Sequence, residues 1–370
     1  MPELPEVETI RQDLLKKLIN KKIARVVVYK PMSVANQKAA FIKALQDNAI
    51  TNIERRGKLL VWSLKFPTVI PSEPRGDEGS LSVVGEPEIS HPLRRGIRND
   101  KSVALLVHLK MTGQLIYIKM SFPRKRESSG DGSPIKSGMT VVAGGHKLSE
   151  KDIDTLPNKW TRIVFVFADG GELFFNDLRL FGYMKLATQS EVDAALKKYG
   201  PEPPLTLPSP VGRGGDSPLL AGEGRRVRSR SQDAGKDFTL SYFSSLFKKR
   251  KNTNLKALLL NQELIAGLGN IYVDEVCFVA GVKPTRRVGS ITKAEQQKLF
   301  HAIPKILTEA LKHRGTTFRN FLDSSGKKGN YTDFLMVYDR DGQPCKRCGK
   351  IILKTKAAGR GTHFCPKCQK

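Results

Sequence analysis

The sequence predicts an α+β protein: an N-terminal antiparallel β-sandwich with an N-terminal helix laid against it, then a helical domain that ends in a cysteine-rich β-hairpin. Three observations lead to this class. Short runs rich in Val, Ile, Leu and Phe alternate with turn residues in the first half of the chain. Helical periodicity with helix-capping residues dominates the second half. Four of the five cysteines fall within the last 26 residues.

The first half contains one helix followed by strands. The apolar residues of segment 6–18 share one helical face: Val7, Ile10, Leu14 and Leu18. Seven segments are expected to form strands: 23–29, 58–64, 103–109, 113–119, 162–168, 172–176 and 182–187. Asp169, Gly170 and Gly171 have the composition of a hairpin turn between two of these strands. Ser190 is expected to cap a short helix that stops at Gly200 and Pro201.

The second half is predicted to be helical. Segments 255–261 and 269–280, with Gly267 and Gly269 between them, form a helix–turn–helix candidate. Thr292 and Glu295 form a capping box for a long helix. We expect this helix to run to about residue 313, with an interruption at Pro304.

Three segments lack hydrophobic periodicity: residues 67–101, 120–150 and 201–236 are rich in Pro, Gly, Ser and Arg. This composition favours solvent-exposed, disordered insertions, and extra basic loops that contact nucleic acid are the alternative. We therefore expect four parts: a sandwich domain over 1–200 that contains the first two insertions, an inserted flexible linker over 201–236, a helical domain over 237–330 and a cysteine-rich domain over 331–370.

Charge indicates the kind of partner. Sixty-three Lys and Arg residues against 36 Asp and Glu residues give a formal charge of +27. A basic surface gains affinity for a polyanion by releasing counterions from phosphates, so nucleic acid is the favoured partner, and a basic surface that only maintains solubility is the alternative. No apolar run approaches the roughly 18 residues that a membrane span requires, and the N-terminus lacks the apolar stretch of a signal peptide. We expect a cytoplasmic protein without a membrane partner.

The C-terminal cysteines have the spacing of a metal site. Cys345 and Cys348 form one CxxC pair, and Cys365 and Cys368 form another. Two such pairs on adjoining turns bring four thiolates around one structural Zn²⁺, whereas a redox pair is the alternative. The basic residues between the pairs, which include Arg360, would lie at the tip of the hairpin. Cys277 lies alone in an apolar stretch and is expected in the core.

The N-terminal string carries the most specific signal. The chain begins MPELPEVET, so removal of the initiator methionine would expose the secondary amine of Pro2. A proline at position 2 is by itself only a processing signal. The string resembles the start of the formamidopyrimidine-DNA glycosylase family, however, and the resemblance continues in order along the chain through RRGKLL (55–60), HLKMTGQL (108–115), NDLRLFGY (176–183), LGNIYVDE (268–275) and the four cysteines.

This resemblance implies a bacterial DNA-repair enzyme that excises oxidised purines, 8-oxoguanine and formamidopyrimidines, from duplex DNA and then cuts the strand. It assigns Pro2 as the nucleophile that forms a Schiff base and Glu3 as the acid that protonates the opening deoxyribose. Glu6 becomes a supporting carboxylate, Lys58 a phosphate contact that aids β-elimination, and Arg360 the hairpin arginine linked to δ-elimination. Taken singly, Glu3 and Glu6 would be ordinary acidic residues of a helix start, and Lys58 a solvated strand lysine.

Elementary chemistry agrees with a proline nucleophile. A secondary amine that attacks the sugar C1′ gives an iminium ion with no N–H left to lose. This cation withdraws electrons, so the C2′ proton becomes acidic and the 3′ phosphate can leave by elimination. An α-amino group titrates at about 7.7–8.0, so a usable fraction of free base exists near neutrality.

The resemblance also implies how DNA is held. A base that is flipped out leaves a gap that side chains must fill, and the family's wedge corresponds to Met111, Arg179 and Phe181. Met and Phe would stack in the gap, and Arg would bond the orphaned cytosine. The remaining matched residues are phosphate contacts: His108, Lys251, Lys256 and Asn270. Each of these residues alone would more readily be an ordinary core or surface residue.

The chain departs from the family pattern at three positions. Trp160 replaces a histidine that often precedes the sixth strand, and Leu180 replaces the second arginine before the wedge phenylalanine. The lysine before the clamp helix is displaced by one position, which leaves Lys251 or Arg250 in its role. A damage-recognition loop is expected around residues 324–331.

Other functions stay open at this stage. An endonuclease VIII-like enzyme would act on oxidised pyrimidines with the same nucleophile, although its N-terminus typically reads PEGPE. A non-catalytic zinc-ribbon DNA-binding protein would not need the Pro2 amine, and an enzyme inactivated by its insertions would keep the same motifs. The favoured interpretation is a monomeric repair enzyme that acts on damaged double-stranded DNA and holds one structural Zn²⁺.

Overall fold

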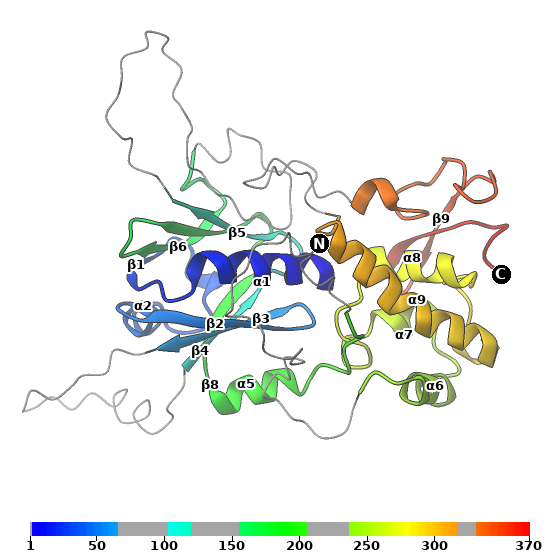
Figure 1. Cartoon of the computed structure of the whole chain (residues 1–370), viewed down its shortest axis with the longest axis horizontal. Coiled ribbons are helices and arrows are strands. Elements are labelled where there is room, and N and C mark those ends of the chain that lie inside the picture. Colours follow the sequence, from blue (N-terminus) through cyan, green and yellow to red (C-terminus); the bar gives the residue numbers. More distant parts are fainter. Residues whose placement is uncertain (1, 66–102, 120–154, 206–236, 317–330) are drawn as a thin grey trace, which may run out of the picture.

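The computed structural model describes residues 2–65, 103–119, 155–205, 237–316 and 331–370, which form a β-rich half and a helical half side by side (Figure 1). The N-terminal helix lies along the β-rich half, and its first turn is at the junction with the helical half. The expected insertions at 67–101 and 120–150, and all of 206–236, lie outside the described residues.

The N-terminal half is a sandwich of two four-stranded sheets. One sheet has the order β1-β6-β7-β5 and the other β2-β3-β4-β8, and all neighbouring strands are antiparallel. Apolar side chains of both sheets, including Trp62 and Phe165, meet in one core. The predicted sandwich and the Gly170 turn between β6 and β7 are therefore confirmed. The strands are β1 (Ile23–Val28), β2 (Ala49–Arg56), β3 (Leu59–Lys65), β4 (Val103–His108), β5 (Gly113–Ile118), β6 (Thr161–Phe167), β7 (Glu172–Asp177) and β8 (Tyr183–Thr188).

Helix α1 (Leu4–Leu18) packs against β2 and β3. The predicted apolar face is confirmed, because its four members are at most 1% exposed and join the sandwich core: Val7, Ile10, Leu14 and Leu18. The helix begins at Leu4, two residues earlier than predicted, with Pro5 in the first turn, where a missing N–H breaks no intrahelical bond.

One α-helix and one strand of this half were not predicted, and the helix after β8 is capped at a different residue and ends at Leu196, before the expected stop at Gly200 and Pro201. Helix α2 (Lys38–Leu45) and strand β2 were not predicted, because each buries only two apolar side chains and so shows a weak pattern. Helix α5 (Gln189–Leu196) is capped by Thr188 and not by Ser190. The Thr188 hydroxyl accepts the Glu191 N–H at 3.3 Å, and the Glu191 carboxylate accepts the Thr188 N–H at 3.0 Å.

The described part of the C-terminal half is built on α6 (Leu240–Lys249), α7 (Leu255–Leu260), α8 (Asn270–Ala280) and α9 (Lys293–Lys312). The predicted helix–turn–helix of α7 and α8 and the capping box of α9 are confirmed, while α6 was not predicted. The expected interruption at Pro304 is wrong, because α9 continues through it. Ile303 and Leu307 on either side are fully buried, and this packing outweighs the one hydrogen bond that a proline removes.

The chain ends in a hairpin of β9 (Leu353–Ala357) and β10 (Arg360–Phe364), joined at Ala358 and Gly359, which both have positive φ. Its base packs on α8, where Phe278 is buried with Cys345 and Cys365.

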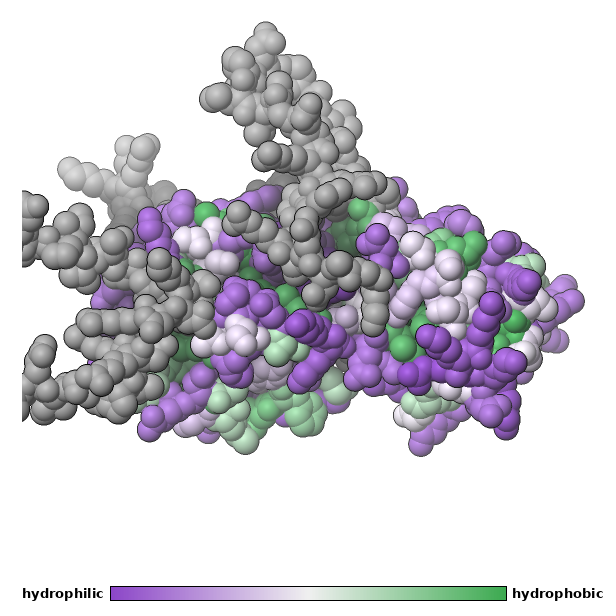
Figure 2. Space-filling model, turned by 90° about the horizontal axis from the view of Figure 1, so that it is seen from below, coloured by the Kyte–Doolittle hydropathy of each residue, from purple (hydrophilic) through white to green (hydrophobic). Residues whose placement is uncertain are grey.

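The 3-10 helices of the described residues are η1 (Pro31–Ser33), η2 (Val288–Ser290) and η3 (Tyr331–Phe334). None of the described helices has the length and apolar character needed to cross a membrane. The face in Figure 2 is mostly hydrophilic over the helical half.

Candidate active site and nucleic-acid interface

The start of the chain is buried at the junction of the two halves. Pro2 is buried, and the Leu4 N–H donates to the Gly267 carbonyl at 3.1 Å. The Glu3 carboxylate accepts the first N–H groups of α8, from Ile271 at 3.0 Å and from Tyr272 at 3.5 Å. A carboxylate is stabilised at this position because a helix N-terminus carries unpaired N–H groups and partial positive charge. The Glu3 side chain therefore bonds the start of α8, while its backbone lies at the start of α1.

The turn before α8 is shaped by this contact. A Cβ atom at Gly269 would lie 2.2 Å from Glu3 Cδ, and one at Gly267, which has φ +96°, would lie 2.2 Å from Leu4 Cδ1. The structure shows that these glycines make room for the N-terminal residues of the same chain.

Glu6 connects three elements around the N-terminus. Its carboxylate accepts the Glu3 N–H at 2.9 Å, the Tyr272 hydroxyl at 2.5 Å and the Thr316 N–H at 2.8 Å. It is fully buried, at the first turn of α1. Glu6 is thus a supporting carboxylate in geometry, because it fixes the backbone next to Pro2 to α8 and to Thr316, in the segment after α9.

The electrostatics of this centre favour proton transfer. Burial raises the pKa of Glu3, with a smaller contribution from Glu6 and opposition from Lys58. Burial lowers the pKa of Lys58, and Arg360 adds to this, while Glu3 and Glu6 oppose it. A carboxyl group that holds its proton closer to neutrality is a better general acid, and an amine that loses its proton more readily is a better general base. Because the charge of Arg360 lowers the pKa of Lys58, Arg360 at the start of β10 lies close enough to act on Lys58, which follows β2.

A buried ion network holds the turn that carries Lys58. Gly57 has φ +56°, and its N–H donates to Glu202 at 2.9 Å. Arg55 lies between Glu8 at 2.8 Å and Glu202 at 2.6 Å, and these two carboxylates raise its pKa against the effect of burial. Sequence reasoning missed Glu202, because it lies 145 residues from Gly57 and inside the segment predicted to be a disordered linker. That prediction is wrong for residues 201–205, where Pro201 and Pro203 are buried.

The three wedge residues lie together on the surface. Met111 is 38% exposed and Phe181 is 58% exposed, and an Arg179 Nη1 is 3.7 Å from Met111 Sδ. Their loops are joined by Asp177, a residue that sequence reasoning did not single out. The Asp177 carboxylate accepts the N–H groups of Arg179 at 3.2 Å and Gly182 at 2.7 Å, and it also bonds the hydroxyl of the Met111 neighbour, Thr112.

His108 lies at the end of β4 as a neutral side chain. Burial lowers its pKa to about 3, and the positive charges of Lys110 and Lys58 add to this effect. Its Nδ1 accepts the Lys110 N–H at 3.0 Å. Because a neutral imidazole whose Nδ1 accepts carries its proton on Nε2, His108 can offer one N–H to a phosphate.

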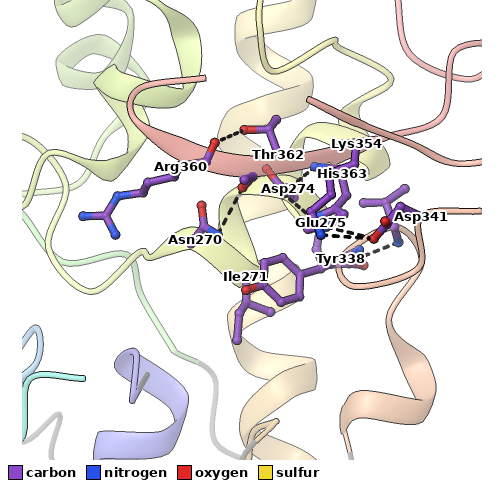
Figure 3. A network of polar contacts seen from close by, with 12 residues as sticks. Asn270, Ile271, Asp274, Glu275, Tyr338, Asp341, Lys354, Arg360, Thr362 and His363 are labelled. Carbon is purple, nitrogen blue, oxygen red and sulfur yellow. Dashed lines mark hydrogen bonds and ion pairs between the residues drawn. The ribbon is translucent and has the colours of Figure 1, made fainter. Parts of the chain in front are cut away.

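The other residues expected to contact phosphate differ in how far their side chains are exposed. Lys251 is exposed after α6, and Asn270 is partly exposed at the start of α8, where its Nδ2 donates to the Gly361 carbonyl at 3.2 Å (Figure 3). Lys256 is fully buried, and its amine bonds Asp274 Oδ1 at 2.6 Å and the Gly361 carbonyl at 2.9 Å. In this conformation Lys256 therefore holds protein groups, in contrast to the expected surface contact. Trp160 is partly exposed, with Lys159 Nζ 4.7 Å from its ring centroid.

The four C-terminal cysteines form a compact cluster, with ligand atoms that all lie within 4.8 Å of one another. The Cys345 and Cys368 sulfurs are 3.9 Å apart, and those of Cys348 and Cys365 are 3.5 Å apart. Four closely spaced thiols suit a tetrahedral zinc ion, since thiolates are ligands that zinc prefers in structural sites. Cys277 is fully buried outside the cluster, as expected.

A cavity of about 480 Å³ lies next to the residues that bind the Glu3 and Glu6 carboxylates. Its wall includes Ile271 and Thr316, the residues whose N–H groups bond Glu3 and Glu6, together with Thr332 and Tyr338. Of the expected recognition loop at 324–331, only Tyr331 is described, and residues 324–330 lie outside the described residues.

Three family models match successive parts of the chain. The formamidopyrimidine-DNA glycosylase N-terminal domain matches residues 1–184, the H2TH domain of the same enzymes matches 232–321, and a zinc finger found in FPG and IleRS matches 342–370. With the buried acids beside Pro2 and the exposed wedge, these matches define the class of the protein as a DNA glycosylase with a helix–two-turn–helix and a zinc finger.

Curated relatives narrow this class. Formamidopyrimidine-DNA glycosylases of Heliobacterium modesticaldum and Acaryochloris marina are 34% and 32% identical, over all of this chain and 100% and 99% of theirs. The chain belongs to the formamidopyrimidine-DNA glycosylase family. A solved Lactococcus lactis member with an N7-benzyl-Fapy-dG containing DNA is 28% identical, with a TM-score of 0.66 and full coverage of both chains. A MutM structure with carbocyclic 8-oxo-G containing DNA is 27% identical, with a TM-score of 0.65 and the same coverage.

Proposed function

We propose that Pro2, after removal of Met1, is the nucleophile through which this chain excises oxidised purines from duplex DNA and then cleaves the strand. The chain is a DNA glycosylase and AP lyase of base excision repair. The observation that carries the residue assignment is the junction itself. It buries Pro2 beside Glu3, whose pKa is raised, and places Lys58 and Arg360 in one electrostatic environment.

The residues divide the reaction among them. The Pro2 nitrogen attacks C1′, and the base leaves with the electrons of its glycosidic bond and takes up a proton. Glu3 gives its proton to the ring oxygen as the C1′–O4′ bond opens, which leaves an iminium ion on Pro2. Lys58 accepts the C2′ proton as the C3′–O bond breaks and the 3′ phosphate departs with the electron pair.

A second elimination completes the strand cut. Water takes the C4′ proton as the C5′–O bond breaks, and the 5′ phosphate departs with the electron pair of that bond, close to Arg360. Water then hydrolyses the iminium and returns the Pro2 amine. An arginine suits this position because its charge is permanent and its planar donors match a phosphate.

The surface groups hold the DNA around this centre. Met111 and Phe181 would fill the gap left by the everted nucleotide while Arg179 bonds the opposite base, and the cavity beside Ile271 would receive the oxidised purine. His108, Lys251 and Asn270 would contact phosphates. The solved relatives with lesion-containing DNA, as their titles state, support this arrangement.

The remaining assignments concern organisation. One structural Zn²⁺ would be held by the four C-terminal cysteines, where it supplies a fixed tetrahedral crosslink for the hairpin. The domains would be 1–200, 237–330 and the zinc finger 331–370, with the linker 201–236 attached to the first domain at its start, where Glu202 bonds Arg55 and Gly57. The chain would act as a monomer in the bacterial cytoplasm.

Borohydride trapping tests the nucleophile. Reduction of the iminium should link the wild-type chain covalently to 8-oxoguanine duplex DNA, and mass spectrometry should place the link on Pro2 in protein that has lost Met1. Pro2→Gly should abolish most trapping but keep salt-sensitive duplex binding, while Pro5→Ala, the loss of a neighbouring proline, should trap normally. Wild-type trapping by Pro2→Gly would refute the assignment. Faster excision of thymine glycol than of 8-oxoguanine would favour the endonuclease VIII-like alternative.

A further inference from the structure

A buried ion pair lies behind the reaction centre, between α7 and α8. The side chains of Lys256 and Asp274 are both 0% exposed, and Lys256 Nζ is 2.6 Å from Asp274 Oδ1. Removing two charges from water is costly, so a pair of this kind needs further hydrogen bonds to be tolerated. Those further bonds all go to one element, the hairpin strand β10.

Strand β10 is attached to the pair at two alternate residues. Asp274 Oδ2 accepts the His363 backbone N–H at 2.9 Å and lies 3.3 Å from His363 Nδ1 (Figure 3). Lys256 Nζ donates to the Gly361 carbonyl at 2.9 Å, and Asn270 Nδ2 donates to the same carbonyl at 3.2 Å. Arg360 directly precedes these anchored residues, so its backbone position follows from theirs.

The metal cluster alone would leave Arg360 loosely placed. Arg360 is five residues from Cys365, or roughly 16 Å along an extended strand at about 3.3 Å per residue. The neighbouring strand gives little support, because β9 is exposed at every residue except Ala357. A two-stranded hairpin is at best marginally stable in water by itself. The contacts to Lys256 of α7 and to Asn270 and Asp274 of α8 are therefore what fixes the outer end of β10.

We propose that the Asp274–Lys256 pair is a positioning device that holds Arg360 at the departing 5′ phosphate and so determines how much of the second elimination occurs. This inference rests on the proposed function for the role of Arg360, and it gives Lys256 a positioning role. Asp274 touches neither the DNA nor the reacting atoms in this scheme. Its effect passes through the backbone of β10.

The test measures product distribution together with hairpin order. Asp274→Asn keeps an acceptor for the His363 N–H but removes the charge that pairs with Lys256, and Lys256→Met removes the lysine donor to Gly361. Abasic duplex DNA is cleaved with each variant, and β- and δ-elimination products are separated on a denaturing gel. Amide hydrogen exchange reports the protection of residues 361–363, and zinc content is measured on the same samples. Asp341→Asn is the matched control, because Asp341 lies 3.4 Å from His363 Nε2 but has its side chain 40% exposed.

In Asp274→Asn we expect the rate of the second elimination to fall about ten-fold to 100-fold, as for a group misplaced by about 1 Å, and base release to stay within about three-fold. Zinc should remain at the wild-type level, and exchange at residues 361–363 should accelerate. Lys256→Met should shift the products and the exchange in the same direction, and Asp341→Asn should shift neither.

Two results would overturn the inference. One is a wild-type product ratio in Asp274→Asn, and the other is loss of zinc with equal loss of base release and both eliminations, which is the signature of general unfolding. If the wild-type chain forms no covalent intermediate through Pro2, the proposed function fails on its own. Exchange then decides the anchoring alone, and unchanged protection at 361–363 in both variants would exclude it.

Discussion

Replacing Gly269 by alanine would test whether the placement of Glu3 controls base release. Gly269 has φ −139° and ψ −164°, an extended conformation that alanine adopts without strain, so the substitution adds only a methyl group. This carbon would lie 2.2 Å from Glu3 Cδ, whereas ordinary contacts begin at 3.4 Å. The carboxyl group must therefore move by about 1 Å, the difference between the two distances.

The displacement has two separable costs. Weakening the Ile271 hydrogen bond to a buried carboxyl should lower the free energy of unfolding by about 1–3 kcal/mol. A catalytic acid that is misplaced by about 1 Å should slow excision of 8-oxoguanine by about 100-fold. Single-turnover excision and chemical denaturation measure the two effects. Gly170→Ala is the control, because Gly170 has φ +79° but open space around it, so alanine there costs stability alone. A folded Gly269→Ala protein that excises at the wild-type rate would refute the reasoning.

Four further outcomes are expected. Glu3→Gln should slow excision of an intact lesion by at least about 100-fold, yet cleave a preformed abasic site within a few-fold of wild type, since that sugar already opens in solution; equal losses on both substrates would contradict the acid role. The rate of excision against pH should be bell-shaped, because it needs the free base of the Pro2 amine and the protonated form of Glu3, whose pKa is raised, and the alkaline fall should vanish in Glu3→Gln. Asp177→Ala should release the wedge loops and slow excision from duplex DNA by about ten-fold without slowing cleavage of a single-stranded abasic site, and parallel losses would argue against the wedge. Cys348→Ser should lose zinc and bind duplex DNA more weakly, whereas Cys277→Ala should keep its zinc and its affinity for duplex DNA. Unchanged affinity in the zinc-free protein would show that the hairpin does not contribute to DNA binding.

The elements that sequence predicted well are those with a strong local signal. The face of α1 repeats with helical periodicity, and the cysteine pairs have a spacing that few structures other than zinc sites use. Strand β2 has no such signal, because it buries only Ile50 and Ile53. The Pro304 prediction failed for the opposite reason, since tertiary packing overrode a clear local breaker.

The site residues divide in the same way. Pro2, Glu3 and Lys58 were named from motif resemblance, and the structure gathers them at one junction. Glu202 and Asp274 act through backbone N–H groups or cations that are distant in sequence, so no pattern within a short window could reveal them. Asp177 binds N–H groups of its own loop, and only its bond to the hydroxyl of Thr112, 65 residues away, shows that it joins two loops. Lys256 was named as a phosphate contact from the same resemblance, but only burial and its 2.6 Å partner show which way its amine points.

The interlock between the first residues and α8 also limits how such chains can be recombined. Glu3 and Leu4 of the first half occupy space left by Gly269 and Gly267, and Glu6 lies against Gly315. All three bond backbone or hydroxyl groups of the second half. A chimera that takes its first 200 residues from one relative and the remainder from another would bring together two surfaces that are not complementary to each other. Such a chimera would be active only if the segment around residue 269 and the N-terminal turn came from the same relative.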